Sequence, residues 1–178
     1  MSPDLFLDAE GILGSMNRQL ASVQQLVEQS NWILANGLGL ADSRRAAPQA
    51  VDIEELIAET ISSRPASIDP PVQCDMSPDL PLIELDPGYG RALIENLLGL
   101  FRQVATDANP VHLRTRAGAE GVEIDVSTAA PGYRSIASLP PGSALSLDCA
   151  QRVAAMHGGS SSHSIDPAGG IRVRVMLP

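Results

Sequence analysis

The sequence predicts an α+β protein, a two-layer sandwich in which helices cover one face of a mixed, mostly antiparallel sheet, preceded by a long N-terminal helix. Three observations predict it: helical periodicity over 10–42, alternating segments that form two hairpins further along, and the segregation of helices from these hairpins. The 178 residues have room for one domain of about 130 residues and an accessory segment. We place a helical dimerisation segment at 1–45 and the domain at 46–178.

The long N-terminal helix rests on a regular apolar stripe. Apolar side chains recur at steps of three or four, at Ile12, Met16, Leu20, Val23, Val27 and Leu34. A helix of roughly 30 residues spans about 45 Å, which is too long for one small domain to cover. We therefore predict that the stripe packs on a second copy of the chain, giving a homodimer. The alternatives are a helix folded back on its own domain, or one broken at Gly11, Gly14 or Gly37.

The remainder of the chain is expected to alternate between short helices and strands. The expected order is linker 41–50, helix 51–63, strand 72–76, loop 77–87, helix 88–105, strands 111–118 and 121–128, helix 143–157, and strands 160–166 and 170–178. Asp52 and Ser143 are expected to cap their helices, because both residue types accept hydrogen bonds from free N–H groups. Gly158 and Gly159 are expected to end the helix that Ser143 begins.

Composition and charge exclude several classes of function. The net charge of −9 argues against a nucleic-acid partner, which would need clustered basic residues. All 12 basic residues are Arg, so no Lys is available for Schiff-base chemistry. Cys74 and Cys149 lack the spacing of a zinc site and are expected to be reduced packing residues. The sequence shows no signal peptide and no apolar run that could insert into a membrane, so we expect a cytoplasmic protein.

Five segments, taken in order, carry a resemblance to a known family. They are ILANGLGLADSRRAAPQAVDIEELIAE, DLPLIELDPGYGRALIENLLGLF, VEIDVSTAAPGY, GSALSLDCAQRVAAMHGG and GGIRVRVMLP. In this order they resemble bacterial sensor histidine kinases, from the second helix of the dimerisation domain through the GHKL-type ATPase domain. The second segment resembles the N-box, the third the G1 box and the fourth the G2 region. The resemblance implies the fold predicted above and a role in two-component signalling.

Within this resemblance, the residues that would read the nucleotide are replaced. The adenine-reading Asp of the G1 box falls on Thr128, and the next two positions on Ala129 and Ala130, although Gly132 is retained. A neutral hydroxyl accepts a hydrogen bond more weakly than a carboxylate does.

The metal and phosphate positions are also altered. In the N-box, Asn96 matches the first Asn, but the second, which holds magnesium in the family, falls on Leu100. Asn96 is therefore either a remaining site residue or a structural amide. The phosphate loop keeps one glycine of three, at Gly142 beside Ser143, and only eight residues lie between Tyr133 and Gly142, where the family has a longer lid.

These departures predict a vestigial nucleotide site and no catalytic residue. The residues of that site are Asn96, Thr128, Gly132, Gly142 and Ser143. The family's phosphoacceptor His is also unmatched, because His112, His157 and His163 all lie after residue 50.

The leading hypothesis is therefore a kinase-like module without ATP or another cofactor, which dimerises and binds a histidine kinase or a response regulator. One alternative is a divergent active kinase that uses ATP and magnesium, with the His supplied by another chain. A second alternative is a phosphotransferase with a kinase-like fold, which needs an exposed His that the long helix lacks.

Overall fold

The computed structural model describes residues 47–63, 72–101, 104–130, 132–140, 142–166 and 169–178. The predicted dimerisation helix lies outside these residues, together with its six stripe residues Ile12, Met16, Leu20, Val23, Val27 and Leu34. The dimer and the boundary at residue 45 therefore stay predictions.

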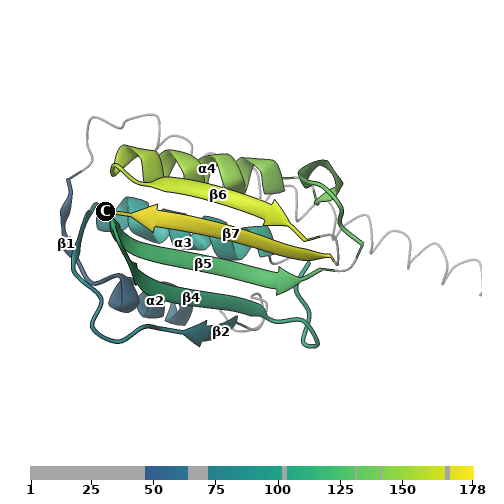
Figure 1. Ribbon diagram of the computed structural model, residues 1–178, viewed down its shortest axis with the longest axis horizontal. Helices are drawn as coiled ribbons and strands as arrows, with labels where there is room; N and C mark the ends of the chain where they lie inside the picture. Colours follow the sequence, from purple (N-terminus) through teal and green to yellow (C-terminus); the bar gives the residue numbers. More distant parts are fainter. Residues whose placement is uncertain (1–46, 64–71, 102–103, 131, 141, 167–168) are drawn as a thin grey trace, which may run out of the picture. The chain divides into compact units, whose positions relative to one another are not determined.

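The described residues form one layer of strands and one layer of helices (Figure 1). The main sheet has five strands in the order β2 (Val72–Asp75), β4 (Val111–Gly118), β5 (Gly121–Ala129), β7 (Gly170–Leu177) and β6 (Ser160–Ile165). Strand β2 runs parallel to β4, whereas all other neighbours in this sheet are antiparallel. The predicted mixed, mostly antiparallel sheet is therefore confirmed.

Three helices cover one face of this sheet, as Figure 1 shows. They are α2 (Ile53–Ser62), α3 (Pro87–Phe101) and α4 (Ser143–Met156), and α4 follows the short 3₁₀ helix η2 (Ile136–Ser138). The core lies between the two layers. Its fully buried side chains include Ile57, Leu93, Leu97, Phe101, Leu113, Ile124, Val126, Val153 and Val173. With so few aromatic residues in the chain, aliphatic side chains supply most of the buried apolar surface that stabilises the fold.

The helix ends explain why these segments stop where they do. Asp52 accepts hydrogen bonds from the N–H groups of Glu54 and Glu55 at 2.9 and 3.2 Å, which confirms it as the cap of α2. At the end of α4, Gly158 adopts a left-handed conformation with a φ of 77°. The N–H of Gly159 then donates to the carbonyl of Ala154 at 2.9 Å, so the predicted glycine end is also confirmed.

Two segments predicted to be irregular contain short strands. Strand β1 (Gln49–Val51) covers the last two residues of the predicted linker 41–50 and the residue after it. Strand β3 (Ile83–Leu85) lies within the predicted loop 77–87. The two strands pair antiparallel in a separate sheet. Each has only three residues, which is too short for an alternating pattern to stand out from flanking prolines.

Three smaller predictions are wrong. Gly142, and not Ser143, is the cap residue of α4, since Ser143 already has helical geometry. Helix α3 ends at Phe101 instead of residue 105. Cys149 is buried as expected, but Cys74 is exposed, because it lies on the edge strand β2.

Candidate functional site

The predicted site residues come from three neighbouring parts of the fold. Thr128 lies near the end of β5, Asn96 lies in α3, and Gly142 and Ser143 begin α4. Helices α3 and α4 contact each other along the sheet. In the described part of the chain, however, no hydrogen bond joins Thr128, Asn96 and the start of α4 to one another.

The hydroxyl of Thr128 is used within the fold. Thr128 is 3% exposed and occupies the helix-facing side of β5, on the same side as Ile124 and Val126. Its Oγ1 donates toward the backbone carbonyls of Asn109 and Pro110, at 3.0 and 2.9 Å. A hydroxyl has a single hydrogen to donate, so these two acceptors share it. The contact ties the end of β5 to the segment that enters β4.

The turn after β5 is held by one backbone hydrogen bond and contains one glycine with a positive φ. The N–H of Ala130 donates to the carbonyl of Gly169 at 2.6 Å, which joins this turn to the β6–β7 turn. Gly132 has a φ of 109°, a conformation that L side chains rarely adopt. A Cβ at Gly132 would meet no atom within 4 Å, so the glycine serves the backbone conformation and not a close approach.

The side chain of Asn96 is turned toward helix α4. It is fully buried, and its Nδ2 donates to the carbonyl of Ala92, one turn earlier in α3, at 2.6 Å. The same amide also forms a side-chain hydrogen bond with the thiol of Cys149 in α4. Burial raises the pKa of that thiol to about 11, the charge of Asp148 adds to the rise, and the Asn96 hydrogen bond offsets part of it. The Oδ1 atom of Asn96 is buried and has no hydrogen-bond partner among the described residues.

The residues around α3 do not fit a magnesium ion. Leu100, at the position to which the resemblance assigns a metal-binding Asn, is 3% exposed and offers no oxygen. The amide nitrogen of Asn96 is already engaged, and one buried amide oxygen is far short of the six or more oxygen ligands that hard cations take. Across the described residues, no group of three or more His, Cys, Asp or Glu side chains is placed to hold a metal ion.

The segment between β5 and α4 forms a short turn held by its own serine. The hydroxyl of Ser138 accepts from the N–H groups of Arg134 and Ser135, each at 3.1 Å, and donates to the carbonyl of Ser135 at 2.7 Å. Leu139, at the end of η2, is buried. A compact 3₁₀ turn therefore stands where the sequence comparison predicted a shortened lid.

The start of α4 retains one glycine-dependent feature. Gly142 adopts a left-handed conformation with a φ of 91°, and no side chain of the described residues caps the helix. Ser143 is 6% exposed, and its N–H donates to the carbonyl of Pro140 at 3.2 Å. The backbone therefore enters α4 through a glycine in the left-handed conformation.

A polar cluster between α3 and α4 was missed at the sequence level. Asp86 caps α3 by accepting from the N–H groups of Gly88 and Tyr89, and its second oxygen accepts from the N–H of Ala47 at 2.8 Å. The N–H of Asp86 donates to Nε2 of His157 at 3.2 Å, and Nδ1 of His157 faces a carbonyl of its own helix. The Asp-Pro and His-Gly-Gly motifs are visible in the sequence, but their contact across 71 positions is not.

Comparisons with known proteins are confined to solved structures, since no family model and no curated protein matches the sequence. The cytoplasmic segment of the histidine kinase QseC is 18% identical, with a TM-score of 0.63, over 84% of this chain and 93% of that one. The ATP-binding domain of PrrB from Mycobacterium tuberculosis is 24% identical, with a TM-score of 0.55, over 74% and 96%.

A third structure is full-length ShkA in complex with AMPPNP. It is 21% identical with a TM-score of 0.66, and the match covers 90% of this chain but 38% of ShkA. At these identities the likeness concerns the arrangement of helices and strands. The sheet order, the three helices on one face and these matches together show that this chain has the fold of a histidine kinase ATPase domain.

Proposed function

We propose that the chain is a degenerate histidine-kinase-like signalling module that does not bind ATP. It dimerises through the segment 10–42 and acts by binding a two-component partner, either a histidine kinase or a response regulator. The observation that carries this proposal is the position of Thr128, whose hydroxyl is buried and donates to the carbonyls of Asn109 and Pro110. At the position where the family reads adenine, this side chain instead forms hydrogen bonds with the backbone of the segment before β4.

Three further features support the loss of nucleotide binding. Leu100 buries a hydrocarbon side chain at the metal position. Asn96 directs its amide to Ala92 and Cys149. The segment that would form a lid is a turn closed by Ser138. Each of these groups stabilises the folded chain itself, so a nucleotide would have to displace contacts that the protein already makes.

Titration of the whole chain with a fluorescent ATP analogue and magnesium tests the proposal. We expect no saturable signal at micromolar nucleotide and no increase in melting temperature, because a ligand stabilises a protein only when it binds the folded state. Saturable binding at micromolar concentrations would overturn the proposal. Thr128→Asp, which restores only the carboxylate, is expected to gain no binding and to lower stability, because the new charge would face two carbonyl oxygens.

Sedimentation of the whole chain tests the dimer separately. We expect a dimer for the natural sequence and a monomer for Leu20→Glu, which places a charge in the apolar stripe. A monomeric natural chain would contradict the dimerisation part of the proposal and leave the nucleotide part to its own test.

A divergent ATP-binding kinase is the second candidate, and one observation favours it. Gly142, where the resemblance places a phosphate-loop glycine, enters α4 in the left-handed conformation, and no described side chain caps the helix there. Helix N-termini of this kind attract anions. This candidate predicts nucleotide protection in thermal melting and transfer of radiolabel from ATP to a His of another chain. Neither is expected if the nucleotide site is vestigial.

A further inference from the structure

The face of the main sheet opposite the helices carries an unusual share of the basic residues. Strand alternation places Arg114 and Arg116 of β4 and Arg172 and Arg174 of β7 on this open face. The structure describes seven Arg side chains, and the other three are Arg91, Arg134 and Arg152. No helix among the described residues lies over these four, since α2, α3 and α4 all cover the other face (Figure 1).

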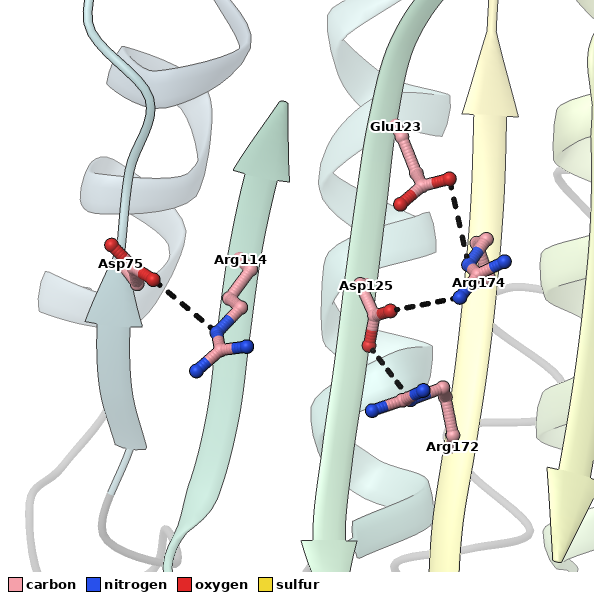
Figure 2. A network of polar contacts seen from close by, with 6 residues as sticks. All are labelled: Asp75, Arg114, Glu123, Asp125, Arg172 and Arg174. Atoms are coloured by element: carbon pink, nitrogen blue, oxygen red, sulfur yellow. Dashed lines mark hydrogen bonds and ion pairs between the residues drawn. The ribbon is translucent and has the colours of Figure 1, made fainter. Parts of the chain in front are cut away.

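A buried carboxylate holds two of these arginines in place. Asp125 lies on the open face but its side chain is only 4% exposed, because Arg172 and Arg174 cover it. Its two oxygens lie 3.4 Å from Nε of Arg172 and 3.5 Å from Nη2 of Arg174, and Glu123 lies 3.5 Å from Nε of Arg174 (Figure 2). Both guanidinium side chains stay about half exposed, at 53% and 45%. Their remaining N–H donors are therefore oriented and still accessible.

The neighbours of these arginines on the open face are small. On the edge strand β6, Ser164 lies opposite Arg172 and Ser162 lies opposite Arg174, and both serines are exposed. On the other side, Arg172 lies opposite Ser127 of β5. Short side chains flank the long ones, so the two guanidinium groups can be reached from the β6 edge.

The local charge of the open face differs from that of the whole chain. The strands place four arginines and three acids there, Asp75, Glu123 and Asp125, whereas the chain has a net charge of −9. At physiological ionic strength charges farther than about 8 Å are largely screened. A partner with a few well-placed carboxylates would be attracted, but a long polyanion such as nucleic acid would also meet the acidic remainder of the molecule.

We propose that the open sheet face, centred on Arg172 and Arg174, is a docking surface for an extended protein segment that carries carboxylates at alternate positions. Two residues apart on one strand, the arginines are separated by about 7 Å, which is also the spacing of alternate side chains on an extended segment. Each guanidinium can bind a carboxylate with two parallel hydrogen bonds. The inference deepens the proposed role as a binding module, because it assigns that role a surface and a partner chemistry.

The test is an NMR titration of the whole ¹⁵N-labelled chain with an unlabelled peptide of alternating threonine and glutamate. We expect saturable shifts of the Nε–H signals of Arg172 and Arg174 and of backbone amides in β6 and β7, weakened about threefold or more by added salt. A peptide with glutamine in place of glutamate should cause no such shifts. Shifts confined to the helix layer, or equal shifts with the glutamine peptide, would overturn the proposal.

Variants separate the surface from general charge effects. R114Q/R116Q leaves the partners of Asp125 intact and is expected to weaken peptide binding about threefold or more. The control R91Q/R152Q removes the same charge away from the open face and should change the peptide affinity less than about twofold. D125N/R172Q/R174Q, which leaves no buried carboxylate unpaired, should abolish binding. Equal losses in R114Q/R116Q and R91Q/R152Q would refute the surface.

Self-association of the chain through the open sheet face is a separate possible outcome of the NMR experiment. If the open-face signals shift with protein concentration in the absence of peptide, the occupant is a second copy of the chain and the proposal is wrong. The nucleotide titration does not depend on this face, so failure here and failure of the proposed function are separate results.

Discussion

Single buried polar residues hold neighbouring segments of this fold together. Thr128 and Asn96 both occupy positions that the resemblance assigns to a nucleotide site, and both make their hydrogen bonds within the chain. Asp125 is an acid inside a strand, and it orients two arginines. In each case the residue type was visible in the sequence, but the partner depended on strand register and helix packing.

Replacement of Asp125 by Asn is expected to lower the free energy of unfolding by about 1–2 kcal/mol, because it removes the buried charge that forms ion pairs with two arginines. The loss stays moderate since both arginines remain half exposed to water. The matched control is Asp75→Asn, which removes an exposed ion pair with Arg114 and should change stability by less than about 0.5 kcal/mol. Urea denaturation measures both, and equal effects would contradict the special role of Asp125.

The cap of α3 is expected to be sensitive to acid. Burial alone would raise the pKa of Asp86, but hydrogen bonds from the N–H groups of Ala47, Tyr89 and Gly88 lower it below its ordinary value of 3.8. A lowered folded pKa means that the contribution of Asp86 to stability is full above that ordinary value. It is lost as the pH falls through the folded pKa.

Thermal melting at several pH values measures this effect as a difference between the natural chain and Asp86→Asn. The difference should be constant near neutral pH and shrink as the pH falls below about 4. A difference that grows on acidification would show that the carboxylate is not stabilised by its hydrogen bonds.

At the scale of elements, the fold depends on how closely neighbouring segments approach. Gly159, between α4 and β6, lies against the backbone of Met176 in β7, so that an added Cβ would collide with the Met176 carbonyl oxygen. Gly99 in α3 has open space around its Cβ position. The two glycines look alike in sequence, but only Gly159 is required by the packing of a strand.

Opposite effects are therefore expected from one type of substitution. Gly159→Ala should destabilise the chain by at least about 2 kcal/mol, because the backbone of β7 must move. Gly99→Ala should stabilise it by about 0.5–1 kcal/mol, because alanine loses less backbone freedom in a helix. Chemical denaturation gives both values, and a stable Gly159→Ala variant would argue against the close approach of β6 and β7 to α4.

For the whole molecule, long periodic elements were predictable and long-range contacts were not. The helices and both hairpins follow from patterns that repeat over several residues, such as the alternation of buried Val122, Ile124 and Val126. Strands β1 and β3 are too short to repeat any pattern. The contact of Asp86 with His157 depends on how two distant helix ends meet, and local spacing carries no information about that.

The two cysteines provide a probe of the whole fold. Cys149 is buried, and burial raises the pKa of its thiol to about 11. Cys74 is exposed as a residue, but partial burial of its thiol also raises the pKa of that group. With a disulfide reagent near pH 8 we expect slow reaction at Cys74 and, at Cys149, reaction only when the fold opens. Cys74→Ser should abolish labelling of the native chain. Rapid reaction of two thiols without denaturant would contradict the packing of α4 against α3.

The position of β7 has a consequence for the order in which the protein can assemble during synthesis. Strand β7 follows β6 in the chain but lies between β5 and β6 in the sheet. Until residues 170–177 have left the ribosome, β6 has no strand to pair with and one edge of β5 is bare. The strands therefore cannot join the sheet in the order in which they are synthesised. A chain interrupted before β7 would present an unpaired strand edge to other nascent chains.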